Sequence, residues 1–154
     1  MSHIPLIPLD LLRYSVSTRL IKNESFLKDE VRKKWVKVTP EELVRQHLIQ
    51  YLLKEKNYPG ALMKLEHPLT LNELKKRSDI VIYSREGKPW MLVECKAAHI
   101  KLTQETLDQA ARYNIKLDVK YLVVCNGIEA LAVKFAGTET STYQFLQDLP
   151  AYGL

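Results

Sequence analysis

Two short apolar runs joined by a polar turn constrain the fold of this chain most. Residues 77–83 (Arg-Ser-Asp-Ile-Val-Ile-Tyr) and 90–97 (Trp-Met-Leu-Val-Glu-Cys-Lys-Ala) are rich in β-branched and aromatic residues, which favours buried β-strands. The polar stretch 84–89 contains Gly and Pro, so we expect a hairpin centred between Glu86 and Gly87. Counting outward from that centre pairs Tyr83 with Trp90, Val81 with Leu92, and Asp79 with Glu94.

Each run carries an acid, and the second also carries Lys96, two residues after Glu94 and therefore on the same strand face. Apolar strands rarely contain ionised carboxylates, because desolvating a charge is unfavourable unless something compensates it. Opposed residues have Cβ atoms roughly 4.5–5.5 Å apart, so Asp79 and Glu94 would repel each other without a cation between them. The pattern predicts a divalent cation here. A one-residue difference in loop length would instead place Asp79 opposite Cys95.

Length and composition predict a single soluble domain of 154 residues, with 46% hydrophobic and 27% charged residues. The N-terminus is interrupted by Pro5 and Pro8, and no segment approaches a membrane span, so we expect a cytoplasmic protein without membrane contact. The net charge of +5 has clusters at 32–34 and 75–77, which suits a polyanionic partner. Two cysteines give neither a disulfide framework nor zinc-ligand spacing.

The remaining pattern predicts helices on both sides of the hairpin. Thr39 is a candidate N-cap, Pro40 suits the first helical position, and Glu42 occupies the capping-box position of a helix ending near Lys56. Further expected elements are a strand at 61–66, hairpin strands at 78–84 and 89–97, a helix at 103–116, and strands at 120–125 and 128–135 joined by Asn-Gly. We expect an α/β fold with a mixed sheet in the order α-β-β-β-α-β-β. The expected divisions are an arm packed on the body at 1–38, a core at 39–136, and a tail at 137–154 with a short helix around 143–149.

A helix Glu, a strand Asp and a strand Glu-x-Lys in this order resemble the PD-(D/E)XK nuclease superfamily. More narrowly, the chain resembles the N-terminal domain of type I restriction enzyme R subunits (HsdR). The resemblance covers about residues 31–135, and the segments that carry it are 39–46 (TPEELVRQ), 76–81 (KRSDIV), 92–97 (LVECKA), 109–114 (QAARYN) and 126–127 (NG). The family usually has Pro before its Asp, whereas here Ser78 precedes Asp79.

The resemblance implies a restriction-endonuclease-like fold and a Mg²⁺-dependent deoxyribonuclease, in which Mn²⁺ could replace Mg²⁺. Asp79 and Glu94 would bind the metal, since Mg²⁺ prefers oxygen ligands, and Lys96 would orient water or stabilise the transition state. By resemblance, Glu42 is a further ligand and Gln109 a further catalytic residue. The residues expected to contact DNA are Tyr113, Arg77, Arg45, Gln46 and Lys76. The expected partners are DNA, helicase or other restriction-modification subunits, and a second copy of the chain.

Simpler explanations stay open for these residues. Glu42 could serve only the capping box, Asp79 could pair with Arg77 or Lys96, and Glu94 could form a salt bridge with Lys96. Glu66 could approach the metal, although a surface role is preferred. Two other function classes also remain: a nuclease-like fold that binds DNA or protein without turnover, and an interaction module whose basic patches bind an acidic protein. A zinc enzyme and a phosphate-loop enzyme are not supported, because neither pattern occurs.

Overall fold

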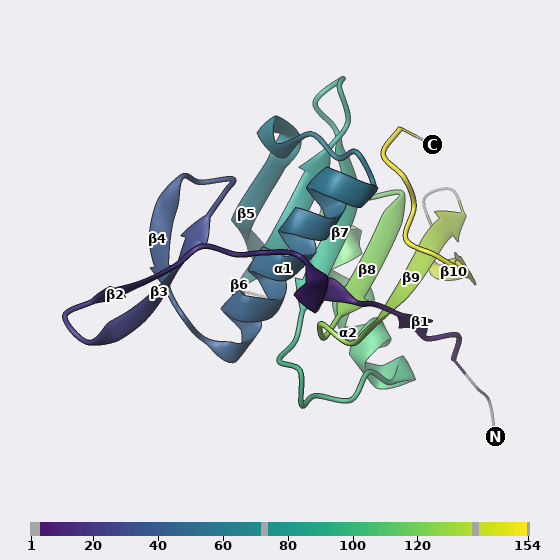
Figure 1. The fold of residues 1–154 in the computed structure, drawn as a ribbon. Helices are drawn as coiled ribbons and strands as arrows, with labels where there is room; N and C mark the ends of the chain where they lie inside the picture. The colour runs from purple at the N-terminus through teal and green to yellow at the C-terminus, as the bar shows by residue number, and fades with distance from the viewer. Residues whose placement is uncertain (1–3, 72–73, 137–138, 154) are drawn as a thin grey trace.

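The computed structural model describes residues 4–71, 74–136 and 139–153 (Figure 1). Within these ranges, the side chains are described except those of residues 12, 67–78, 113–116 and 139–141.

A mixed sheet forms the centre of the molecule and holds seven strands within the described ranges, in the order β1-β9-β8-β7-β6-β5, with β10 also pairing with β9. Their bounds are β1 Ile7–Pro8, β5 Met63–Leu71, β6 Leu74–Tyr83, β7 Pro89–Cys95, β8 Tyr121–Cys125, β9 Glu129–Ala136 and β10 Glu139–Phe145. Strands β7 and β8 are parallel, and the other neighbouring strands are antiparallel. Helix α2 (Gln104–Leu117) makes the crossover that a parallel pair requires. The predicted α/β fold and its α-β-β-β-α-β-β order are confirmed.

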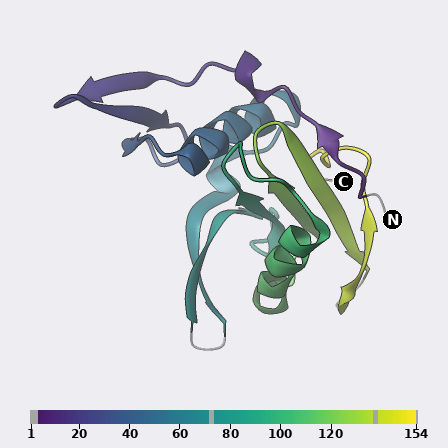
Figure 2. The ribbon, with the colours of Figure 1, turned by 90° about the horizontal axis from the view of Figure 1, so that it is seen from below.

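Helices α1 (Pro40–Glu55) and α2 cover opposite faces of the sheet (Figure 2). On the α1 face, Leu48, Ile49 and Leu52 pack with alternate residues of the central strands, Ile80, Ile82, Met91 and Val93. On the α2 face, Leu107 and Ala110 pack with Val81, Leu92, Leu122 and Val124. Burial of both faces explains why the central strands read as continuous apolar runs. In the described part of the chain, no helix has the length and apolarity that crossing a membrane requires.

The start and end of α1 follow from local sequence. The Oγ1 of Thr39 accepts a hydrogen bond from the N–H of Glu42 at 3.1 Å, and Pro40 lies in the first turn. The helix ends at Glu55, and Asn57 then adopts the left-handed conformation with φ 58°. The predicted helix is therefore confirmed to within one residue.

The hairpin register is confirmed inside the sheet and wrong at the turn. Val81 lies opposite Leu92 as predicted, but Tyr83 pairs with Pro89 rather than Trp90, because a bulge follows Ile82. In the turn, the N–H of Ser84 donates to the carbonyl of Lys88 at 2.7 Å, and Gly87 has φ 84°. The bulge is confined to the turn end, and the pairing continues without a further shift as far as Ile80 and Val93.

The N-terminal segment contains more sheet than the sequence suggested. After a short β1 and a 3-10 turn at Leu11–Arg13, three antiparallel strands follow: β2 Thr18–Ile21, β3 Glu24–Asp29 and β4 Lys34–Lys37. Lys22 and Asn23 connect β2 to β3 with φ values of 51° and 65°, the sign that a tight type I′ hairpin turn needs at both positions. Figures 1 and 2 show this sheet reaching beyond α1 and away from the main sheet.

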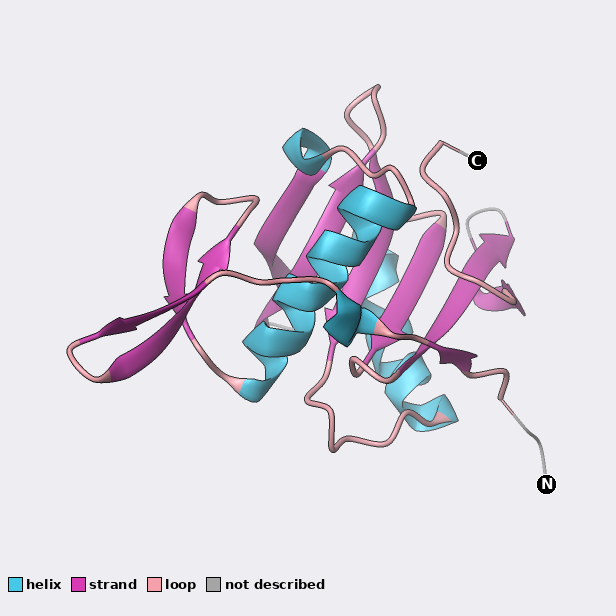
Figure 3. Ribbon diagram, viewed as in Figure 1, coloured by secondary structure: helices cyan, strands magenta, loops and turns pink. Residues whose placement is uncertain are grey.

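The helix expected around residues 143–149 does not form. Residues 139–145 are strand β10, with Tyr143 opposite Phe135 of β9 (Figure 3). The segment is rich in Thr and aromatic residues, which favour strands, and the edge of β9 offers unpaired backbone groups. Pairing with an existing edge therefore outweighed the weak helical pattern.

Candidate functional site

Asp79 lies where the pairing of β6 with β7 ends, beside the backbone of Cys95. Ile80 lies opposite Val93, and the recorded pairing of the two strands ends there, one residue before Asp79 and Glu94. The Oδ2 of Asp79 accepts a hydrogen bond from the backbone N–H of Cys95 at 2.6 Å, which ties the carboxylate to β7. Glu94 of β7 is buried with 9% exposure, and Lys96 comes directly after the last residue of this strand. Asp79 thus lies beside the segment that carries Glu94 and Lys96, and the charge of Lys96 reaches it.

Burial dominates the electrostatics of Asp79. It raises the pKa of this carboxyl above the ordinary value, while the N–H of Cys95 and the charges of Arg45 and Lys96 act in the opposite direction. The negative charge of Glu42 adds to the rise. An additional cation nearby would therefore stabilise the ionised form of Asp79.

Glu42 faces this carboxylate from α1. Arg45 holds Glu42 with two hydrogen bonds, one from Nε to Oε2 at 2.8 Å and one from Nη2 to Oε1. Gln46 donates from Nε2 to Oε2 of Glu42 at 3.1 Å. Spacings of three and four residues put all three side chains on one helix face. The N–H of Glu42 is thus capped by Thr39, but its carboxylate binds Arg45 and Gln46, so capping does not account for this side chain.

Arg32 and Glu66 complete the charge network, and sequence reasoning did not assign either to the site. Arg32 lies 3.2 Å from Glu66 and 3.7 Å from Glu42, and Arg45 lies 3.5 Å from Glu66 and 3.8 Å from Asp79. Burial raises the pKa of Glu66, but Arg45 and Arg32 outweigh it, so the net pKa is lowered. Glu66 has φ 55°, an uncommon backbone conformation within a strand. The sequence signal for Arg32 was only its membership of a basic cluster.

A cavity of about 400 Å³ opens beside these residues. Its lining joins α1 to the N-terminal sheet and comprises Arg32, Lys34, Val36, Lys37, Thr39, Glu41, Glu42, Arg45, Glu66 and Asp79. The structure therefore brings together Asp79, Glu42 and Arg45 of the predicted site residues, with Gln46 bonded to Glu42. The lysines of β4 give the cavity a basic rim.

Four other predicted site residues lie on β6 and α2. Gln109 is exposed on α2. Arg77 and Lys76 lie in β6 and Tyr113 lies in α2, but their side chains fall outside the described residues. The predicted roles of Gln109 and of these three stay predictions.

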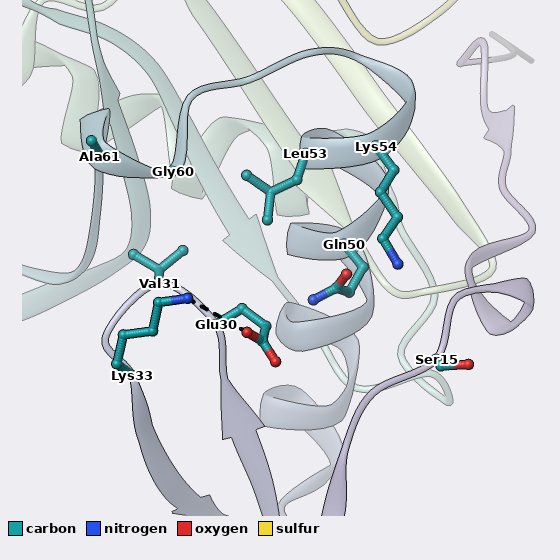
Figure 4. A pocket seen from close by; sticks show the side chains of 9 residues that line it. All are labelled: Ser15, Glu30, Val31, Lys33, Gln50, Leu53, Lys54, Gly60 and Ala61. Carbon is teal, nitrogen blue, oxygen red and sulfur yellow. Dashed lines mark ion pairs between the residues drawn. The ribbon is translucent and has the colours of Figure 1, made fainter.

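A larger cavity of about 600 Å³ lies elsewhere, between α1, the turn after β3 and the 3-10 turn Gly60–Leu62 (Figure 4). Its polar residues include Gln50 and Lys54 from α1, and Lys33, whose Nζ lies 3.6 Å from Glu30. Neither Asp79 nor Glu42 lines it. Because the clustered carboxylates lie at the smaller cavity, that cavity is the better candidate for the functional site.

The donors at the smaller cavity are carboxylate oxygens, the ligand type that Mg²⁺ prefers. Among the described residues, no group of three or more His, Cys, Asp or Glu side chains is arranged to hold a metal ion. Two protein carboxylates can suffice for Mg²⁺, because this ion usually keeps several waters. The carboxylate donors of Asp79 and Glu94 are of the type that Mg²⁺ binds, although of the two only Asp79 lines the cavity.

Comparison with known proteins assigns the family. The family described as the type I restriction enzyme R protein N terminus matches residues 40–150. No curated protein matches the chain. A solved fragment of a candidate HsdR subunit of a type I restriction enzyme from Vibrio vulnificus YJ016 is similar with a TM-score of 0.50 and 22% identity, covering 67% of this chain and 22% of the other. A candidate nuclease from Anabaena variabilis ATCC 29413 gives a TM-score of 0.43 and 10% identity, covering 92% and 86% of the two chains.

The chain thus spans less than a quarter of the Vibrio chain it matches. The family match covers most of the present sequence and includes α1, β6, β7 and α2, which carry the predicted motifs. The chain belongs to the family of type I restriction enzyme R protein N-terminal domains, and its mixed α/β fold is similar to that of the solved HsdR fragment.

Proposed function

We propose that this domain hydrolyses phosphodiester bonds of DNA with the help of Mg²⁺ bound by Asp79 and Glu94. The observation that supports the proposal is the hydrogen bond from the N–H of Cys95 to Asp79, which holds this carboxylate beside the segment that carries Glu94 and Lys96. Family membership supports the same chemistry, because this family forms part of restriction enzymes.

The protein residues would share the work as follows. Asp79 and Glu94 would hold the ion, which when bound withdraws charge from the phosphate and makes a bound water more acidic. Lys96 would orient the attacking water or stabilise the extra negative charge of the transition state. Glu42 would act from α1, as a ligand directly or through water. Gln109 and Tyr113 would assist from α2, and Arg77, Lys76, Arg45 and Gln46 would contact DNA.

A second candidate function is a nuclease-like fold that binds DNA or protein without turnover. It is favoured by the charge network itself, since Arg45 and Arg32 already compensate Glu42 and Glu66 without an ion. Calorimetric titration with Mn²⁺ separates the two. Binding that Asp79→Ala and Glu94→Ala each abolish supports hydrolysis, whereas no binding, or binding that survives both changes, favours the second candidate.

Cleavage of plasmid DNA tests the activity directly. The unmodified chain should nick or linearise plasmid with Mg²⁺ and lose this activity with EDTA. Asp79→Ala and Lys96→Ala should each abolish cleavage, while Asp108→Ala and Lys88→Ala, which remove the same charges at exposed positions, should keep it. Circular dichroism would check that each variant folds. Equal cleavage by the unmodified chain and both site variants would exclude the proposed site.

The partners follow from the same proposal. Because the family is the N-terminal part of type I restriction R proteins, we propose that the domain works with DNA and with helicase or other restriction-modification subunits. A second copy of the chain and a cytoplasmic location are further proposals. Size-exclusion chromatography with light scattering, with and without DNA, would test the dimer.

A further inference from the structure

The sheet β2-β3-β4 holds most of the net charge of the chain. Residues 18–37 contain seven Lys and Arg and three Asp and Glu, a net charge of +4 against +5 for the whole sequence. The segment contributes Arg32, Lys34 and Lys37 to the wall of the candidate site. The positive charge is thus concentrated on one element next to the carboxylates.

The two faces of this small sheet differ. On β3, Ser25, Leu27 and Asp29 alternate with Phe26 and Lys28, and Leu27 and Asp29 are buried. The register places Arg19 and Lys37 opposite Phe26, and Trp35 opposite Lys28, so these five residues share the outer face. The outer face therefore combines three cations with two aromatic rings.

Trp35 organises two of these cations. The guanidinium carbon of Arg19 lies 5.3 Å from the centre of a Trp35 ring, and Nζ of Lys28 lies 5.5 Å from it. Both distances are within the range of cation–π attraction. Holding two long side chains against one ring restricts their rotamers, so less conformational entropy is lost when they meet a ligand. Trp35 is thus suited to act as a positioning residue for Arg19 and Lys28.

We propose that the outer face of β2-β3-β4 binds the phosphate backbone of DNA and guides it to the neighbouring cavity. The choice of DNA rests on the proposed function. Charge complementarity supports it, since Arg19, Lys28 and Lys37 are cations while Glu24, paired with Lys37 at 3.7 Å, is the acid on this face. Lys37 belongs both to the sheet and to the cavity lining, so the two surfaces are continuous. Phosphate contacts position nucleic acid without reading sequence, so this face should bind without base preference.

The intrinsic fluorescence of Trp35 provides the test. The chain has two tryptophans, and Trp90 packs among Tyr58, Tyr121 and Tyr152. Trp90→Phe leaves Trp35 as the reporter, and this variant is titrated with a 20-base-pair duplex in EDTA at several salt concentrations. We expect the Trp35 signal to change with DNA. Arg19→Ala/Lys28→Ala should raise the Kd at least about tenfold and reduce the slope of log K against log salt by about 2.

A matched control removes two exposed lysines elsewhere, Lys88→Ala/Lys134→Ala, with the same loss of charge. This control should keep the affinity within about twofold, because long-range charge effects are screened by salt. Trp35→Ala should weaken binding and Trp35→Phe should restore most of it, since Phe retains a ring face; because these variants lack the Trp35 signal, their affinity is measured by the fluorescence anisotropy of a dye-labelled duplex. Thermal melts establish that each variant folds before its affinity is interpreted.

The outcomes separate this surface from the proposed function. Equal affinity of the Arg19/Lys28 variant and the parent for DNA would exclude the proposed DNA-binding role of this surface, even if Asp79→Ala still abolished cleavage. Loss of DNA affinity in that variant supports the proposed DNA-binding role of the surface, whether or not the parent cleaves DNA. Polyglutamate that binds as tightly as the duplex would overturn DNA as the occupant and point to an acidic protein.

Discussion

The carboxylate of Asp79 accepts a hydrogen bond from the backbone N–H of Cys95 over 2.6 Å, so the acid of β6 is fixed to the strand that carries Glu94. Burial raises the pKa of Asp79. Between the unfolded pKa, about 3.9, and this higher folded value, the native state binds more protons than the unfolded state. Stability therefore falls as pH rises through that window, and ionised Asp79 lowers stability at neutral pH.

Asp79→Asn should accordingly stabilise the fold at pH 7 while removing Mn²⁺ binding. The amide carries no charge, and its oxygen can still accept the N–H of Cys95. Asp79→Ala should behave differently, because it leaves that N–H without an acceptor, a loss of about 1–3 kcal/mol. Urea unfolding of both variants measures the difference. An Asn variant less stable than the unmodified chain would contradict this account of Asp79.

Cys95 and Cys125 should resist thiol reagents in the folded protein. They lie opposite each other on β7 and β8, and both are buried free thiols. Burial raises the pKa of Cys125 to about 12 and that of Cys95 well above its ordinary value, so the reactive thiolate is scarce at pH 8. Labelling with a chromogenic disulfide reagent should be at least about tenfold slower in buffer than in urea. Rapid labelling of either native cysteine would contradict this burial.

The central hairpin and α1 could be predicted because their signals are local. The apolar runs around Val81 and Leu92 need partners on both faces, and Thr39-Pro40 specifies a helix start. The order of the strands could also be predicted from the sequence, since the chain between β7 and β8 is long enough for a helical crossover. The turn register failed because a bulge next to Tyr83 has no distinct sequence signal.

The N-terminal sheet and its contribution to the site could not be predicted in the same way. The turn at Lys22-Asn23 lacks the Asn-Gly that usually marks a type I′ hairpin, so β2 and β3 were not recognised as a pair. Arg32 meets Glu66 across 34 residues of sequence, a contact that exists only after folding. The ion pairs around Glu42 therefore required tertiary structure, although the carboxylate itself was predicted.

The Glu42–Arg45 pair should contribute strongly to stability. Both side chains are almost fully buried, with 10% and 6% exposure, so removing one partner leaves a buried charge with only more distant counter-charges, such as Arg32 at 3.7 Å from Glu42. Arg45→Met should lower the free energy of unfolding by about 3–5 kcal/mol. The double variant Glu42→Leu/Arg45→Met should lose clearly less than the sum of the single changes, because no unpaired charge of this pair remains.

The exposed pair Arg13–Glu55 supplies the control for this cycle. Its atoms approach to 3.2 Å, but the side chains are 52% and 46% exposed. The same double-mutant cycle there should give a coupling of at most about 1 kcal/mol. Similar coupling energies for the two pairs in urea unfolding would mean that burial does not strengthen the Glu42–Arg45 pair.

Asp29 should make the fold sensitive to acid. Its fully buried carboxylate accepts hydrogen bonds from the N–H groups of Val31 and Arg32 at 2.9 and 2.8 Å, and from Nε of Arg32 at 2.6 Å. Burial raises the pKa of Asp29, but these bonds and the charge of Arg32 outweigh it, so the net pKa is lowered. For such a group, the stabilisation is complete above the unfolded pKa of about 3.9 and is lost as pH falls through the folded pKa.

Asp29→Asn should therefore be less stable than the unmodified chain at pH 7, by about 1–3 kcal/mol, and the difference should shrink below pH of about 4. Urea unfolding midpoints at pH 7, 5, 4 and 3 measure this convergence, with Glu86→Gln in the exposed β6–β7 turn as the control that should show almost no difference at neutral pH. A constant difference across this range would show that the charge of Asp29 is irrelevant. Because Asp29 also holds Arg32 against Glu66 and Glu42, protonating it should loosen the carboxylate cluster before the central sheet unfolds.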